Sequence, residues 1–202
     1  MSNKFVLDVV KRTGTSVERN MEMISNKLES EEFTKHEKYV VTKLNYQRSS
    51  RILKTYSVNE NLRNLVLQIN EPQLWMIITE DWCGDSAQNI PYISKIAELN
   101  PMIDLKLISR DDNPDIMDLY LTDGQLKSIP KFVAFDMKGN ELFQWGPRPK
   151  LAQEVVNKGK NEGLSKDEFL SKLHLYYADN KGKNLEDEFL ILLNSLKTVL
   201  HS

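Results

Sequence analysis

The amino-acid sequence predicts an α/β fold built on a mixed sheet, with helical extensions before and after it. The central observation is an apolar run over residues 73–79, the pattern of a strand covered on both faces. A polar turn and an amphipathic helix follow it, and later segments alternate between strand and helix periodicity. Over residues 73–160 the elements read β-α-β-α-β-β-α. Strands joined through helices are expected to be parallel, and the final hairpin adds an antiparallel strand.

The first amphipathic helix is expected after a start that carries little pattern. Residues 1–14 predict a short strand or a loose end, followed by Gly14. Residues 15–18, Thr-Ser-Val-Glu, match a capping box, so a helix should begin there. Its inward stripe has α-helical spacing and consists of Val17, Met21, Ile24 and Leu28.

A second helix is expected over residues 33–56. The apolar side chains that should face inward are Val40, Val41, Leu44, Ile52 and Tyr56. The segment is also basic, which fits either a solvated helix face or contact with an acidic partner or nucleic acid. Because no groove-reading motif accompanies it, we favour the solvated face. A second capping box, Ser57 to Glu60, starts a third helix that ends at Pro72.

The elements after the first strand are recognised by periodicity and by turn residues. In chain order they are a helix that carries Ile90, Ile93, Ile96 and Ala97, a strand over 103–107, a loop over 110–114, a short helix over 116–121, a strand over 132–135, a turn at Lys138 and Gly139, a strand over 141–145 and a helix from about Lys150.

The end of the chain reads as two further helices. Residues 165–168 form a capping box, residues 179–182 should end that helix, and Asn184 should cap the last one. The wide apolar stripe of the last helix favours packing on the N-terminal helices or, second, a homodimer interface. It comprises Leu185, Phe189, Leu192, Leu193, Leu196, Val199 and Leu200. The predicted division is an N-terminal helical extension over 1–57, an α/β domain over 58–160 and a C-terminal helical extension over 161–202.

The composition excludes several classes of protein. Hydrophobic residues make up 40% and charged residues 28%, which is typical of a globular chain. A net charge of −2 provides no basic surface for nucleic acid. No apolar run has the length of a membrane helix, and the start is too short and interrupted for a signal peptide. A single cysteine excludes a disulfide framework and favours a reducing, cytoplasmic location.

Cys83 is the residue with the clearest chemical potential. It follows the buried strand where the turn enters the helix, and the first amides of a helix favour an anion such as a thiolate. A lone cysteine is often only a small buried hydrophobe. The strand-turn-helix setting favours the nucleophile. Glu80, Asp81 and Asp85 oppose ionisation, so the sign of the pKa shift stays open.

Residues 82–86, Trp-Cys-Gly-Asp-Ser, resemble the Trp-Cys-Gly-Pro-Cys site of the thioredoxin superfamily. Pro91 matches its helix proline, and residues 128–135 resemble the strand that begins with its cis-proline. Asn113-Pro114 and the turn at 138–140 fall in the expected order, so the resemblance covers about residues 58–160.

The resemblance implies a thioredoxin-like fold and a substrate surface around the sulfur. A cis Ile129–Pro130 bond would place the Ile129 backbone beside the thiol, where an extended substrate can pair with it. The alternative is a trans proline at a strand start. Trp82 would cover the thiol as an apolar contact, or else belong to the core. Gly84 and Asp85 complete the expected surface.

Two departures from the family pattern change the expected chemistry. Ser86 replaces the second cysteine, and Ile77 and Leu107 stand where the family tends to have an aspartate and a lysine. No intramolecular disulfide can form, so the expectation is a monothiol protein whose Cys83 forms mixed disulfides with protein or low-molecular-weight partners. Ser86 would either donate its hydroxyl to the thiolate or serve only to start the helix.

Two other functions remain open from the sequence. One is a non-catalytic module that binds peptides through Trp82, Ile129 and Pro130. The other is an assembly role for the helical extensions. Metal-ligand spacing and phosphate loops are absent, so no metal or cofactor is expected. The histidines, His36, His174 and His201, are scattered and suggest no Cys–His pair.

Overall fold

The computed structural model describes residues 3–200 and the side chains of residues 3–196. The chain forms two compact units that divide between Pro147 and Arg148. The first holds the sheet and the second is helical. The predicted domain limits at residues 57 and 160 stay a prediction. No helix in the described part of the chain is long and apolar enough to cross a membrane.

The first unit contains a four-stranded sheet in the order β2-β1-β3-β4. Its central strand has the predicted bounds, and every residue in it is buried. The strands are β1 (Gln73–Thr79), β2 (Ile103–Ser109), β3 (Lys131–Asp136) and β4 (Glu141–Trp145). The predicted mixed α/β sheet, with its β-α-β-α-β-β-α order, is therefore confirmed.

The direction of β3 differs from the prediction. Only β2 runs parallel to β1, whereas β3 pairs with β1 antiparallel. The link between β2 and β3 holds one short helix, α7 (Pro114–Met117), and long irregular segments. Such a link can bring the chain back to either end of the sheet. The rule that strands joined through a crossover helix run parallel therefore did not apply to β3.

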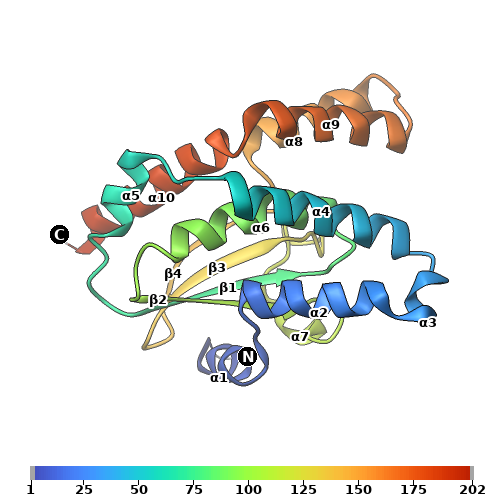
Figure 1. Cartoon of the computed structure of the whole chain (residues 1–202). Helices are drawn as coiled ribbons and strands as arrows, with labels where there is room; N and C mark the ends of the chain where they lie inside the picture. Colours follow the sequence, from blue (N-terminus) through green and yellow to red (C-terminus); the bar gives the residue numbers. More distant parts are fainter. Residues whose placement is uncertain (1–2, 201–202) are drawn as a thin grey trace. The chain divides into compact units, whose positions relative to one another are not determined.

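Helices cover both faces of the sheet (Figure 1). On one face, α1 (Asn3–Thr13) and α7 pack on the even-numbered side chains of β1, from Leu74 to Ile78. On the other face lie α6 (Gly84–Ala97) and α4 (Tyr39–Thr55). On β1 the odd-numbered Trp75 packs edge-on against Phe132 of β3. The sheet is thus the middle layer of three.

The start of the chain is helical, which corrects the expected strand or loose end. In α1 the residues Val6, Leu7, Val9 and Val10 are buried in the core. Asp8, which interrupts the apolar run, lies on the exposed face of the helix. Gly14 then ends the helix, and Thr15 forms a β-bridge with Leu107.

Two predicted helix caps are displaced by one and two residues. Helix α2 (Val17–Glu29) is capped by Ser16, which accepts from the Arg19 amide, because Thr15 is engaged with β2. Helix α5 (Glu60–Val66) is capped by Asn59 rather than Ser57. Serine and asparagine are both strong capping residues. Where several of them precede a helix, tertiary contacts decide which one caps it.

The predicted inward face of α4 is confirmed for Ile52 and wrong for its three other helical members. The side chains of Val40, Val41 and Leu44 are 74%, 37% and 43% exposed. The buried face is mostly polar and consists of Thr42, Asn45, Ser49 and Ile52. A short helix, α3 (Glu31–Thr34), precedes α4 and accounts for the break in the predicted 33–56 segment.

The second unit consists of α8 (Lys150–Asn161), α9 (Lys166–Asn180) and α10 (Lys183–Leu200). Helices α8 and α9 pack through a small apolar cluster of Ala152, Val156, Leu173 and Tyr177. The predicted capping box of Ser165 and Glu168 is confirmed. Asn184 lies inside α10 instead of capping it. The side chains of Val199 and Leu200, as well as His201, lie outside the described residues.

Candidate functional site

Cys83 lies at the junction between the central strand and α6. The strand β1 ends at Thr79, and a short turn follows in which the Cys83 amide donates to the Glu80 carbonyl at 3.1 Å. Cys83 is the N-cap residue of α6 with φ −79° and ψ 117°, and its side chain makes no capping hydrogen bond. The apolar strand and the helix start therefore fix the sulfur at the amino end of α6.

The structure brings Cys83 and Ile129 together, as the resemblance implies. The thiol donates to the Ile129 carbonyl with 3.3 Å between Sγ and O. Residue Ile129 precedes Pro130 through a cis peptide bond, and β3 begins one residue later. The Cys83 side chain is 8% exposed and Ile129 is 6% exposed. The sulfur is therefore almost fully shielded from solvent and lies against the loop that contains Ile129.

The environment of Cys83 raises the pKa of its thiol above the ordinary value of 9.0. Burial is the largest cause, and the negative charge of Asp85 adds to it. The Ser86 hydroxyl and the amides of Ser86 and Asp85 act in the opposite direction because they stabilise a thiolate. The pKa shift that the sequence left open is thus upward, and the neutral thiol is the resting form at pH 7.

Ser86 occupies a buried position between the strand end and the sulfur. Its Oγ accepts a hydrogen bond of 2.8 Å from the Thr79 hydroxyl, and its own hydroxyl lowers the pKa of Cys83. The side chain is 4% exposed. Ser86 therefore contacts the sulfur and belongs to α6 at the same time, and Thr79 is a neighbour that the sequence did not single out.

Trp82 is half-buried beside the thiol, and two cations lie over its ring. The Lys38 Nζ is 4.8 Å and the Arg110 Cζ is 4.9 Å from its ring centroid. Trp82 packs on the core cluster that includes Cys83, and its role as a substrate contact stays a prediction. Lys38 and Arg110 are far from Trp82 in sequence, and no local pattern indicates this contact.

The acidic residues around Cys83 are mostly engaged elsewhere. Asp81 pairs with Lys27 of α2 at 2.6 Å. Glu80 Oε1 accepts from the Ser109 hydroxyl and the Asp111 amide, both at 2.9 Å. Of the three acidic residues that the sequence placed near the sulfur, Asp85 is the one whose charge raises the pKa of Cys83.

Gly84 and Asp85, which the resemblance includes in the substrate surface, are the first two residues of α6 and are partly exposed. The apolar positions Ile77 and Leu107 are buried and face each other across β1 and β2. Within the described residues, no group of three or more His, Cys, Asp or Glu side chains could hold a metal ion.

Comparison with known proteins identifies related sequences and folds. A family model described as thioredoxin matches residues 20–162. The 1.5 Å crystal structure of a protein of unknown function from Pseudomonas aeruginosa is similar, with a TM-score of 0.56, 18% identity and coverage of 75% of this chain and 85% of that chain. A crystal structure of an HIV epitope-scaffold has a TM-score of 0.53, 19% identity and coverage of 75% and 86%. No curated protein matches. At these identities the structural likeness supports the fold alone.

Proposed function

Because this chain belongs to the thioredoxin family, we propose that it is a monothiol protein that exchanges thiols and disulfides through Cys83. The observation that carries the proposal is the position of the sulfur. It lies at the amino end of α6, with the Ile129 carbonyl at 3.3 Å and the Ser86 hydroxyl beside it. A protein with a reactive single thiol fits a reducing cytoplasm, which is the location that we propose.

The proposed reaction begins with loss of the Cys83 proton to water or a dissolved base. The hydrogen bond to Ile129 is then lost, and the Ser86 hydroxyl with the first amides of α6 stabilises the thiolate. The thiolate attacks one sulfur of a protein or low-molecular-weight disulfide and forms a mixed disulfide. The other sulfur leaves as a thiolate and takes a proton from water.

The second half of the reaction requires a thiol from outside the chain. Cys83 is the only cysteine, so no intramolecular attack can release the captured partner. A low-molecular-weight thiolate attacks the mixed disulfide, bonds to the partner sulfur and returns Cys83 as the leaving thiolate. The Ile129 backbone and the exposed face of Trp82 would hold the partner during this time.

Glutathione disulfide tests the proposal directly. Intact-mass measurement should show one glutathione per chain. At pH values below the thiol pKa, the rate of adduct formation should rise about tenfold per pH unit, because the fraction of thiolate rises by the same factor. Cys83→Ala should give no adduct. Ser86→Ala should slow the reaction several-fold, whereas Ser94→Ala, a buried serine on the same helix, should not. If the folded protein gives no adduct even at pH 9 while the urea-unfolded chain does, the exchange function is wrong.

A second candidate is a peptide-binding module that no longer exchanges disulfides. The observation that favours it is the buried, protonated thiol that is already bonded to Ile129. In this case cysteine-free extended peptides selected for binding should lose affinity in Trp82→Ala and keep it in Cys83→Ala. An affinity that depends on Cys83 and is lost with excess reductant would instead support exchange.

A further inference from the structure

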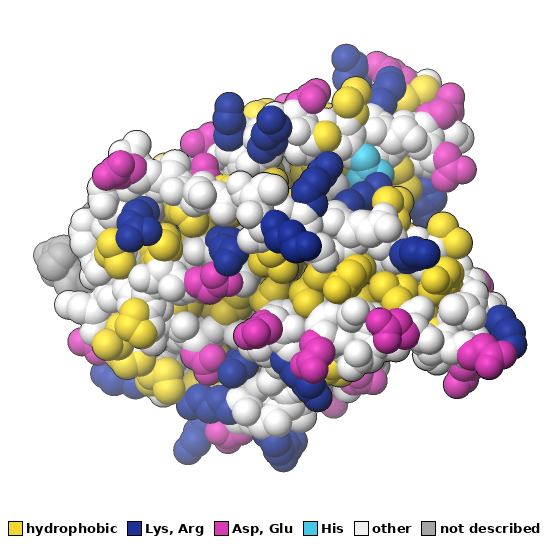
Figure 2. All heavy atoms as spheres, viewed as in Figure 1, with side chains coloured by type: hydrophobic (Ala, Val, Ile, Leu, Met, Phe, Trp, Pro, Cys, Tyr) yellow, Lys and Arg dark blue, Asp and Glu magenta, His cyan; other side chains and the backbone are white. Residues whose placement is uncertain are grey.

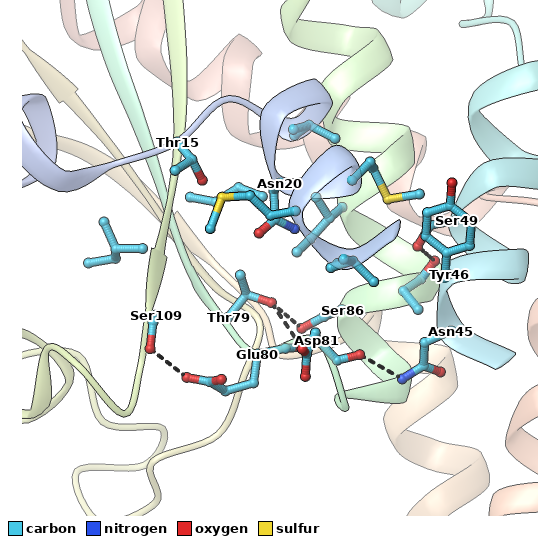
Figure 3. A pocket seen from close by; sticks show the side chains of 18 of the residues that line it. Thr15, Asn20, Asn45, Tyr46, Ser49, Thr79, Glu80, Asp81, Ser86 and Ser109 are labelled. Atoms are coloured by element: carbon cyan, nitrogen blue, oxygen red, sulfur yellow. Dashed lines mark hydrogen bonds between the residues drawn. The ribbon is translucent and has the colours of Figure 1, made fainter. Parts of the chain in front are cut away.

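A cavity of about 660 Å³ lies in the first unit (Figure 3). Its walls come from α2, α4, α6 and the carboxyl ends of β1 and β2. This volume falls within the range of about 300–1,000 Å³ that is typical of small-molecule sites. Cys83 is not part of the lining, whereas Ser86 is. The cavity therefore adjoins the proposed exchange site at Ser86 but does not include the sulfur.

One side of the cavity is apolar and is formed by a helix whose stripe is incompletely packed. In α2 only Val17 is buried, and Met21 and Ile24 are half-buried because they line the cavity. Ile90 and Pro91 of α6 line it as well. Figure 2 shows hydrophobic side chains along the hollow between α2 and α4. An amphipathic helix normally buries such a stripe, so an apolar molecule here would complete its burial.

The other side of the cavity carries an excess of negative charge. Among the described residues that line it, Glu80, Asp81 and Asp112 are acidic and Lys27 is the one cation, which gives three negative charges against one positive, or −2. Lys27 is already bonded to Asp81 at 2.6 Å. Both hydrogen bonds to the Glu80 carboxylate are accepted by Oε1, and within the described residues Oε2 receives none. This end of the cavity favours a cation.

We propose that this cavity binds a small amphipathic molecule with an apolar body and a cationic head group. The body lies between α2 and α6, against Met21, Ile24 and Ile90. The head group, an ammonium for example, lies at Glu80 Oε2. Its charge offsets the negative charge of the lining, and the apolar stripe of α2 loses its contact with water. No step of the exchange reaction enters the proposal.

The test compares three probes of equal chain length on the full-length protein by isothermal titration calorimetry: octylamine, octanoate and octan-1-ol. Octylamine is expected to bind one molecule per chain and at least about tenfold more tightly than octanoate, since one probe pairs with Glu80 and the other is repelled. Glu80→Gln, which keeps the acceptor Oε1, should weaken octylamine about tenfold and leave octan-1-ol unchanged. Glu22→Gln, on the exposed face of α2, should change neither.

Filling the cavity provides an independent test. Ile24→Trp should abolish binding of both octylamine and octan-1-ol, and Asn20→Phe on the same wall serves if the first variant does not fold, as judged by its circular dichroism and thermal melt. Absence of saturable octylamine binding, octanoate binding as tight as octylamine, or unchanged affinity in the filled variants would each overturn the proposal.

Discussion

At the scale of single residues, the hydrogen on the Cys83 sulfur is the feature with the widest consequences. The thiol donates to Ile129, and burial raises its pKa above that of an unfolded chain. Below about pH 9 both states keep the proton, so the full stability is present. As the pH rises toward the folded-state pKa, the unfolded chain ionises first and stability is lost.

The first prediction concerns this pH dependence. The free energy of unfolding of the wild-type protein should fall, relative to that of Cys83→Ala, as the pH rises above about 9, because the folded state resists ionisation of the thiol. Urea unfolding in the presence of a reductant at pH 7, 9 and 10 measures the free energy of unfolding of each protein. If the two free energies change with pH in parallel, Cys83 is not shielded from solvent in the folded protein.

The second prediction also belongs to the residue scale. Ser86→Cys places a second thiol three positions after Cys83 on the same helix start and restores the spacing that the family uses. Dithiol-driven reduction of insulin, measured as turbidity, should then rise at least about tenfold because the new thiolate can release the mixed disulfide. Ser94→Cys adds a thiol farther along α6 and should give no gain. Equal activity of the two variants would contradict the monothiol proposal.

Sequence reasoning predicted a contact across the fold where the family resemblance records it and missed such contacts where no motif does. The resemblance indicated that Cys83 and Ile129 would be neighbours. The cations on Trp82, from Lys38 and Arg110, could not be predicted because no local spacing encodes them. The sign of the Cys83 pKa shift needed burial to be known, and burial outweighs the helix amides.

At the scale of elements, α4 shows why apolar periodicity is an incomplete guide. Two of its buried side chains bond to main-chain carbonyls: Asn45 Nδ2 donates to Asp81 at 3.1 Å, and Ser49 Oγ donates to Ala87 at 3.2 Å. The surface that α4 covers is therefore polar, and a polar helix face satisfies it better than valine or leucine would. The strand bounds were predictable because β1 is apolar on both faces.

The third prediction tests this polar packing. Asn45→Ala should lower the free energy of unfolding by about 1–2 kcal/mol, since the part-buried Asp81 carbonyl loses its donor. Val40→Ala, on the same helix but with the side chain 74% exposed, should change it by less than about 0.5 kcal/mol. Urea unfolding of both variants gives the comparison. The reverse order would mean that α4 packs through its apolar side.

At the scale of the whole molecule, the sequence predicted the layers and the order of elements but not every direction. The order of strands and helices follows from local pattern, and the two-faced apolar strand identifies the centre of the sheet. The antiparallel β3 depends on how residues 110–130 cross the sheet edge, which no periodicity records. For the helical end of the chain, the sequence also predicts a homodimer.

The fourth prediction places that homodimer on other residues than the predicted stripe of α10, because Leu185, Phe189 and Leu193 of that stripe are buried within the chain. Leu175 and Ile191, on α9 and α10, are 64% and 67% exposed. If they form the interface, the protein should elute as a dimer in size-exclusion chromatography with light scattering, and the double variant Leu175→Glu and Ile191→Glu as a monomer. The control is Val40→Glu, because the Val40 side chain is also exposed but lies in the first unit. The protein with this substitution should stay dimeric. A monomeric wild-type protein would exclude this interface.

The sulfur of Cys83 occupies a helix cap that it does not fill, and this affects how the residue should be replaced in any experiment. Serine is among the best capping residues, and a hydroxyl at this position could accept from an amide that the thiol leaves unbonded. The customary cysteine-to-serine control would thus remove the reactive atom and reinforce α6 by about 1 kcal/mol at once. Cys83→Ala removes the reactive atom without adding a cap. The difference in melting temperature between Cys83→Ser and Cys83→Ala therefore measures the capping stability that α6 lacks while a thiol occupies this position.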